Sequence, residues 1–303
     1  MCEGEVVFGV LSGHEADPGA SALALRLMGA VHRLVLSGEA PELARNYPSA
    51  GGVPGSAWPA FLDLLRERRD ELRELVERPV QTNEPARCAA LLGGFLEVAR
   101  ETGMPLRLLE VGASAGLNLR FDSYRYELGD ERWGPDGSPV TVRARLTGTP
   151  PLGTRVRIDS RAGCDMKPLD PRREDDRLTL ASFVWPDQLE RHERLRAALT
   201  IAEQVDAPVE PAGAADWTEA RLAEPADGTA TVIVHSIVMQ YLPAEERDRF
   251  ERALESASGT RAWLRMEPGD EQLTEIRLKR WPGGEDRLLA RAGYHGDPVD
   301  WLA

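Results

Sequence analysis

The amino-acid sequence predicts an α/β protein built on a doubly wound, mostly parallel sheet, with an N-terminal helical cap and an inserted β-hairpin. Three observations predict this fold class. An apolar run at residues 106–111 is followed by a glycine turn at 112–116 and by a helical pattern at 117–124. After residue 105, short apolar runs alternate with helical patterns, as in parallel sheets whose strands are connected by helices. Before residue 103, helical spacing of apolar side chains dominates.

The N-terminal part of the chain is predicted to be helical. Apolar side chains recur at helical spacing over residues 22–36. Residues 61–76 combine an apolar stripe with a mixed-charge face, which is typical of a helix that packs on one side. Thr82 or Asn83 is expected to cap one more helix. We therefore assign residues 1–103 to a helical cap that partly covers the pocket of the domain that follows.

Residues 104–303 are assigned to the α/β domain. Besides 106–111, its predicted strands are 155–164, 208–211, 231–234, 261–266 and a closing hairpin of 275–281 with 286–292. The stretch 125–150 interrupts the alternation. Its two extended segments, 126–128 and 140–146, are separated by a Gly/Pro-rich turn, which predicts an inserted β-hairpin.

Composition restricts the class of ligand. The chain has 303 residues, 42% of them hydrophobic, and a formal net charge of −13. Such an acidic chain is not expected to bind nucleic acid or an anionic membrane surface. Three scattered cysteines form neither a disulfide framework nor a zinc motif, and no signal peptide or membrane-spanning run is expected. We therefore expect a cytoplasmic protein that acts on a small molecule or a protein.

The glycine turn favours one of three nucleotide ligands. No Gly-Lys-Ser/Thr follows Gly116, so a P-loop is excluded. Counted from Gly112, the second and third glycines of a dinucleotide fingerprint are replaced by Ser114 and Leu117. A loop that binds S-adenosylmethionine tolerates alanine and serine, since no pyrophosphate must lie on the backbone. Glu110 would then meet the ligand's amino group, and the N-terminus of the following helix would meet its carboxylate.

The ribose of such a ligand needs an acidic residue, and two candidates exist. Asp136 lies 20 residues beyond Gly116, which is the expected spacing, but it sits in a Gly/Pro turn. Asp165 lies 49 residues beyond Gly116 and ends a predicted strand. We prefer Asp165, because its spacing becomes normal once the hairpin at 125–150 is treated as an insertion.

Residues 109–119 and 163–168 resemble the first and second motifs of class I S-adenosylmethionine-dependent methyltransferases, and residues 213–217 resemble their adenine-binding loop. The resemblance implies a seven-stranded sheet and S-adenosylmethionine as cofactor. The cofactor-binding residues that it implies are Glu110, Gly112, Ala113, Ser114, Gly116, Asn118, Asp165 and Asp216. The wider chain also resembles an uncharacterised bacterial domain-of-unknown-function family, through residues 81–84, 110–119, 184–187, 235–241 and 281–284.

Candidate catalytic residues follow the later strands. His235 ends the fourth strand, where this fold class places its active sites, and is a candidate base; the alternative is a structural histidine. Tyr241 could lie beside the cofactor. Asn83, Glu84 and Trp185 are candidates for substrate binding. The expected activity is methyl transfer to an unidentified acceptor.

Two other functions stay open. Residues 112–116 also spell Gly-x-Ser-x-Gly, the nucleophile motif of α/β-hydrolases, with Ser114 as nucleophile and His295 as base. Against this, no oxyanion loop lies upstream, and Glu110 has no use in that mechanism. The chain could also keep the cofactor-binding core as a non-catalytic or regulatory protein, because a fold does not fix a function.

Overall fold

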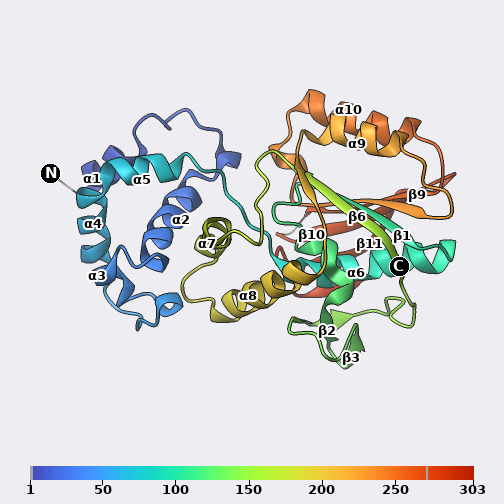
Figure 1. Cartoon of the computed structure of the whole chain (residues 1–303), viewed down its shortest axis with the longest axis horizontal. Coiled ribbons are helices and arrows are strands. Elements are labelled where there is room, and N and C mark those ends of the chain that lie inside the picture. Colours follow the sequence, from blue (N-terminus) through green and yellow to red (C-terminus); the bar gives the residue numbers. More distant parts are fainter. Residues whose placement is uncertain (1–2, 271) are drawn as a thin grey trace. The chain divides into compact units, whose positions relative to one another are not determined.

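The computed structural model describes residues 3–270 and 272–303 and divides the chain into two compact units (Figure 1). Met1–Thr82 and Asp170–Arg196 form one, the helical unit; Asn83–Leu169 and Ala197–Ala303 form the other, the sheet unit. The sequence-based assignment placed the boundary at residue 103 instead. The difference arises because helix α6 (Cys88–Thr102) packs against strands of the sheet unit.

The helical unit is built around α2 (Leu23–Leu36), which packs against α5 (Arg69–Val76) and α7 (Glu174–Ser182). Its other helices are α1 (Glu3–Leu11), α3 (Pro41–Ala44) and α4 (Trp58–Glu67). The helix predicted over 61–76 is thus two helices, because Arg68 leaves the helical region with φ −115° and ψ 29°. Val31, Leu65 and Leu72 are fully buried in the core that these helices share.

The sheet unit contains a nine-stranded, mostly parallel sheet in the order β5-β12-β11-β10-β9-β8-β1-β6-β7. The strands are β1 (Leu106–Val111), β5 (Leu146–Thr147), β6 (Ile158–Asp165), β7 (Val209–Pro211), β8 (Ala230–Ser236), β9 (Arg261–Pro268), β10 (Thr274–Trp281), β11 (Arg287–Ala292) and β12 (Val299–Trp301). Five neighbouring strands of this sheet, β9, β8, β1, β6 and β7, are parallel to one another. Strands β10 and β11 form the predicted antiparallel hairpin. The sequence predicted seven strands; β5 and β12 add two at one edge.

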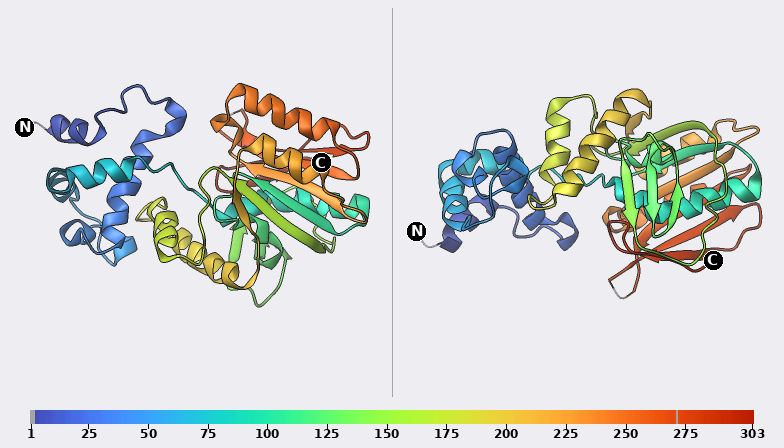
Figure 2. Two further views of the ribbon diagram at one scale, coloured as in Figure 1. Left: turned by 45° about the horizontal axis from the view of Figure 1, so that its top comes forward. Right: turned by 90° about the horizontal axis from the view of Figure 1, so that it is seen from below.

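Helices cover both faces of the sheet (Figures 1 and 2). On one face, Leu109 and Val111 pack with Phe250 under α9 (Ala214–Ala223) and α10 (Ala244–Ser256). On the other face, α6 packs closely against β9 at Gly94. A Cβ at this position would lie only 2.3 Å from Leu264 Cδ1, so a larger residue would force Leu264 to shift. Helix α8 (Leu189–Gln204) links the two units along the chain.

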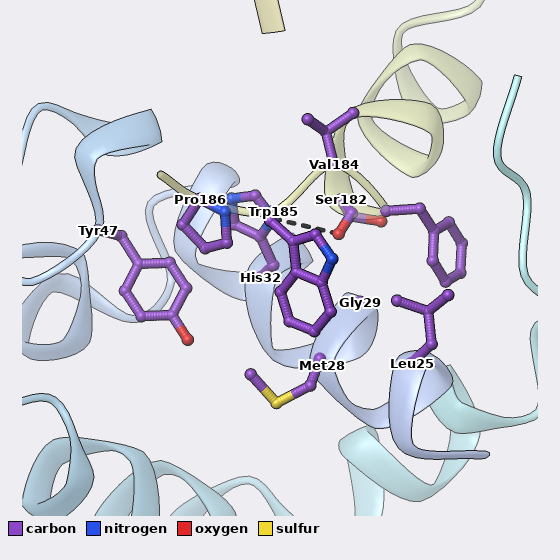
Figure 3. Close-up of a pocket in the computed structure, with 10 residues that line it drawn as sticks. Leu25, Met28, Gly29, His32, Tyr47, Ser182, Val184, Trp185 and Pro186 are labelled. Atoms are coloured by element: carbon purple, nitrogen blue, oxygen red, sulfur yellow. Dashed lines mark hydrogen bonds between the residues drawn. The ribbon is translucent and has the colours of Figure 1, made fainter. Parts of the chain in front are cut away.

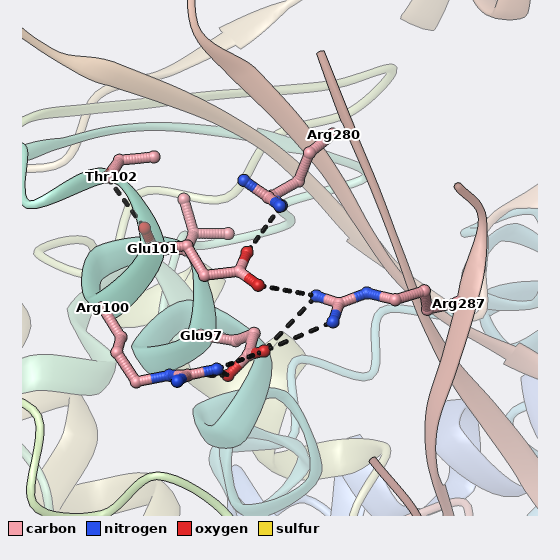
Figure 4. Close-up of polar contacts among 7 residues, drawn as sticks. Glu97, Arg100, Glu101, Thr102, Arg280 and Arg287 are labelled. Atoms are coloured by element: carbon pink, nitrogen blue, oxygen red, sulfur yellow. Dashed lines mark hydrogen bonds and ion pairs between the residues drawn. The ribbon is translucent and has the colours of Figure 1, made fainter. Parts of the chain in front are cut away.

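Ion pairs attach the end of α6 to the β10–β11 hairpin (Figure 4). Glu101 Oε2 lies 2.6 Å from Arg280 Nε, and Glu97 Oε1 lies 3.4 Å from Arg287 Nη2. Arg100, one turn along α6, donates to Glu97 at 2.8 Å. Because Glu97 is buried, these charges must pair, and they fix the helix on this part of the sheet.

The predicted inserted hairpin is a three-stranded sheet of order β3-β2-β4. Strand β2 (Arg125–Leu128) pairs antiparallel with β3 (Glu131–Trp133) and parallel with β4 (Thr141–Ala144). The two predicted segments, β2 and β4, are therefore neighbours. The prediction that they pair antiparallel, as in a hairpin, is wrong, because they pair in parallel. Gly129, with φ +61°, turns the chain early, so β3 occupies one side of β2 and β4 reaches the other.

None of the helices in the described ranges combines the length and apolar composition that a bilayer crossing requires. Cys88 and Cys164 are free and buried, and Cys2 lies outside the described residues.

Candidate functional site

The candidate site lies at the carboxyl edge of the large sheet, where β1, β6, β8 and β9 all end. Strands β6 and β7 extend to one side of β1, and β8 and β9 extend to the other. Sheets of this kind bind ligands where the strand order reverses in this way, outside the carboxyl ends of the strands. Glu110, Asp165 and His235 lie at or next to these ends, so strand pairing gathers three residues that the sequence singled out. Glu267, near the end of β9, lies at the same edge.

Residues 112–117 form a tight turn after β1, which we call the glycine bend. Gly112 and Gly116 have φ of +68° and +67°, and a Cβ on Gly112 would lie 2.5 Å from Val238 Cγ2. Ser114 has φ +53°, a left-handed conformation that is unusual for a residue with a side chain. Ile237, which follows β8, has φ +58°. Backbone strain thus occurs on both strands that flank the reversal point, a pattern that is common at functional sites.

The α-helix predicted after the glycine bend is wrong. Residues Asn118–Ser123 form a 3₁₀ segment in which Arg120 leaves the helical region, with φ −103° and ψ 20°. Side chains take the hydrogen bonds that a helix would have made: Arg120 Nη1 donates to Gly116 O at 2.7 Å, and Tyr124 Oη donates to Leu117 O at 2.5 Å. The expected helix N-terminus, and with it the expected carboxylate site, is therefore not formed.

Asn83 meets the glycine bend from the segment that precedes α6. Its Oδ1 accepts hydrogen bonds from Ala115 N at 3.2 Å and from Leu117 N at 2.9 Å. Asn83, a predicted substrate-binding residue, is buried and contacts the protein's own backbone here. Glu84 accepts from Ala86 N at 3.0 Å and starts the 3₁₀ turn η3 (Pro85–Arg87).

Asp165 contacts the glycine bend directly. Its Oδ2 accepts from Ser114 N at 3.0 Å, and its Oδ1 accepts from Lys167 N at 2.9 Å. The side chain is partly exposed. Asp136, the alternative acid, lies in the turn between β3 and β4, is 97% exposed and pairs with Arg125 at 3.4 Å. Of the two candidates, Asp165 is therefore the one that lies against the bend.

Glu110 is a buried carboxyl group below the bend. Burial raises its pKa to about 8, against the opposing effects of a hydrogen bond from Asn118 and of the charges on Arg120 and Arg87. In the described part of the chain its Oε2 is buried and has no hydrogen-bond partner. An unpartnered buried oxygen is costly, so it marks a position where a hydrogen-bond donor would be stabilising.

His235 is fully buried, and both of its ring nitrogens are hydrogen-bonded. Trp263 Nε1 donates to Nε2 at 2.9 Å, so the ring proton is on Nδ1, which donates to Glu267 Oε1 at 2.7 Å. The same oxygen accepts from Val238 N and Met239 N. Burial, the largest single effect, raises the pKa of Glu267. His235 and these two amides together lower the pKa by more than that, so it lies below its ordinary value. His235 therefore connects β8 and β9 and holds the segment that faces Gly112.

The remaining candidates are spread over the molecule. Tyr241 lies in the 3₁₀ turn η5 (Met239–Tyr241) and is 52% exposed. Asp216 is exposed in the first turn of α9 and pairs with Arg249 of α10. Trp185 belongs to the helical unit, where it lines a cavity of about 10 Å³ with His32 and Tyr47 (Figure 3). That volume is about enough for one water molecule.

Sequence reasoning missed Arg87, the last residue of η3. Its Nη1 lies 3.4 Å from both the carbonyl and the hydroxyl oxygen of Ser236, at the end of β8, and its Nε donates to Tyr294 O at 3.2 Å. Its charge also acts on Glu110, at the end of β1. Nothing in the local sequence indicates this position, which depends on how η3 packs on the sheet.

The model of a family described as an uncharacterised protein conserved in bacteria, DUF2332, matches residues 3–301 of the chain. No curated protein and no solved structure matches the chain.

Proposed function

We propose that this chain, which belongs to the DUF2332 family, binds S-adenosylmethionine at the carboxyl edge of its large sheet and transfers the methyl group to an acceptor. One observation carries the proposal. A carboxylate at the end of the second parallel strand, Asp165, is hydrogen-bonded to the glycine bend that follows the first strand. Next to that contact the strand order reverses, which is where sheets of this class bind nucleoside ligands.

The residues present fit the parts of this cofactor. Each oxygen of Asp165 accepts one backbone N–H and keeps a second acceptor position, which suits the two ribose hydroxyls. None of the residues that the structure describes donates a hydrogen bond to Oε2 of Glu110, which suits the ligand's amino group. An ammonium group close to Glu110 would also favour the ionised form of a carboxyl group whose pKa burial has raised.

When bound, the sulfonium would supply an activated methyl group, and the protein's contribution is to position it and to exclude water. His235 is better suited to positioning than to proton transfer, because both of its nitrogens are already bonded to Trp263 and Glu267. Through Glu267 it holds the amides of Val238 and Met239 in place beside the bend. We expect the methyl acceptor to be a small molecule or a protein.

Isothermal titration of the full chain with S-adenosylmethionine and S-adenosylhomocysteine tests the proposal. We expect both to bind, and we expect Asp165→Ala to weaken binding at least tenfold, since it removes the ribose acceptors (~1.4 kcal/mol per tenfold). Asp136→Ala is the matched control, and it should leave the affinity unchanged. Failure of the wild type to bind either ligand would refute the proposal. Binding without methyl transfer to any of a panel of acceptors would favour the non-catalytic alternative.

One observation favours the hydrolase as a second candidate. Ser114 has φ +53°, a strained backbone of the kind that nucleophile turns adopt. Turnover of a p-nitrophenyl ester that is lost in Ser114→Ala would support this function. The methyltransferase proposal predicts no turnover that depends on Ser114.

A further inference from the structure

The backbone N–H groups of the glycine bend are already hydrogen-bonded within the protein. Ala113 N donates to Cys164 O at 3.0 Å, and Gly116 N donates to Ala113 O at 2.7 Å. Ser114 N is bonded to Asp165, and the amides of Ala115 and Leu117 are bonded to Asn83. An anionic group of a ligand at this bend would therefore find the five amides from 113 to 117 occupied. Its recognition must come from a side chain.

The charges around the bend narrow the choice of side chain. Glu110, Asp165 and Glu267, at the ends of β1, β6 and β9, would repel an anion when ionised. Arg120 is 2% exposed and its guanidinium donates to the carbonyls of Gly116 and Val205, so it is committed to the chain's own backbone. Lys167 is exposed beyond the end of β6, two residues after Asp165.

Arg87 is placed differently from these groups. Its contacts reach Ser236, at the end of β8, and its charge acts on Glu110, at the end of β1, so it spans the two strands where the order reverses. It is partly exposed. Both contacts with Ser236 measure 3.4 Å, which is beyond the usual range for N–H···O hydrogen bonds. A carboxylate would form shorter, charge-assisted bonds with the same guanidinium.

We propose that Arg87 binds the carboxylate of an amino-acid-type ligand at the carboxyl edge of the sheet. In this position Arg87 replaces the N–H groups of a helix N-terminus as the group that binds the carboxylate. Those N–H groups are not accessible to a ligand here, because Asn83 accepts hydrogen bonds from two amides of the bend. Arg87 suits this task better than a lysine, because its planar guanidinium matches a carboxylate with two parallel hydrogen bonds. The inference rests on the proposed function and adds which group recognises the acidic end of the cofactor.

The test compares S-adenosylhomocysteine with its decarboxylated analogue, which lacks only the carboxylate, by isothermal titration of the full chain. We expect Arg87→Gln to weaken binding of S-adenosylhomocysteine at least tenfold and binding of the analogue less than twofold. Arg87→Lys should give an intermediate loss, and Lys167→Gln should change neither affinity. Equal losses for both ligands, or no loss for either, would overturn the role of Arg87 while leaving the proposed function standing.

A second measurement does not depend on how well the Arg87 variants fold. In the wild type, raising the salt concentration should weaken the binding of S-adenosylhomocysteine more than the binding of the analogue. Salt screens the partly exposed ion pair between Arg87 and the carboxylate, which the analogue lacks. Identical salt dependence for the two ligands would contradict the inference. If the wild type binds neither ligand, the proposed function itself fails and the inference fails with it, so the two failures are distinguishable.

Discussion

At the scale of single residues, Glu110 shows how burial makes one carboxyl group sensitive to pH. It lies at the end of a strand that is buried throughout, so its ionised form loses the hydration that it has in the unfolded chain. Its pKa is raised to about 8 in the folded protein, against an ordinary value of 4.5. Between these values the folded state keeps a proton that the unfolded state has released.

This difference fixes the sign of a pH dependence. Because the folded state binds more protons, the contribution of Glu110 makes the free energy of unfolding fall as pH rises from 4.5 to about 8. Glu110→Gln cannot ionise, so we expect its stability relative to the wild type to increase by a few kcal/mol across this window. Urea unfolding of both proteins at pH 5, 6.5 and 8 measures the difference. A difference in the free energy of unfolding between the two proteins that stays constant over this pH window would contradict the raised pKa.

At the scale of elements, the glycine bend depends on a side chain from another part of the chain. Asn83 supplies the acceptor for two amides of the bend, so its Oδ1 replaces a helix cap. We expect Asn83→Ala to lower the free energy of unfolding by about 1–3 kcal/mol, since it leaves buried amides unsatisfied. Asn83→Asp keeps an acceptor in place and should lose much less. Chemical denaturation checks this order, and equal losses in the two variants would show that the amides do not depend on this oxygen.

The elements also show what the sequence could predict. The strand at 106–111 and the turn after it were predictable, because an apolar run and two glycines are local signals. The missing α-helix at 117–124 was not, since Asn83, Arg120 and Tyr124 satisfy its backbone through contacts that spacing does not reveal. Likewise, periodicity located β2 and β4 but could not reveal that β3 makes them parallel.

At the scale of the whole molecule, the helical unit is discontinuous in sequence. Asp170–Arg196 folds with the N-terminal helices, although it follows a strand of the sheet. Its helical pattern does not reveal which core it joins, so sequence reasoning assigned it to the α/β domain. His32 illustrates the joint core: its Nδ1 donates to Ser182 O at 3.1 Å, and its Nε2 accepts from Ser49 Oγ at 2.7 Å.

The two units should respond oppositely to mild acid. Burial lowers the pKa of His32 from 6.5 to about 4, so its contribution to stability is present above pH 6.5 and is lost as pH falls toward 4. Glu110 has the opposite effect on the sheet unit. Hydrogen exchange, corrected for intrinsic rates, should show α2 losing protection in the wild type between pH 7 and 5, by about 2 kcal/mol. This loss of protection should be smaller in His32→Gln. An equal loss in that variant would show that titratable groups other than His32 cause it.

The central claim, that the glycine bend and Asp165 together bind a nucleoside with an amino-acid tail, is tested most directly by a crystal structure grown at saturating S-adenosylhomocysteine. The account predicts ribose hydroxyls on the carboxylate of Asp165, with the ligand's amino-acid end between the bend and Arg87. Ligand density elsewhere on the molecule, or an empty carboxyl edge at saturation, would contradict it.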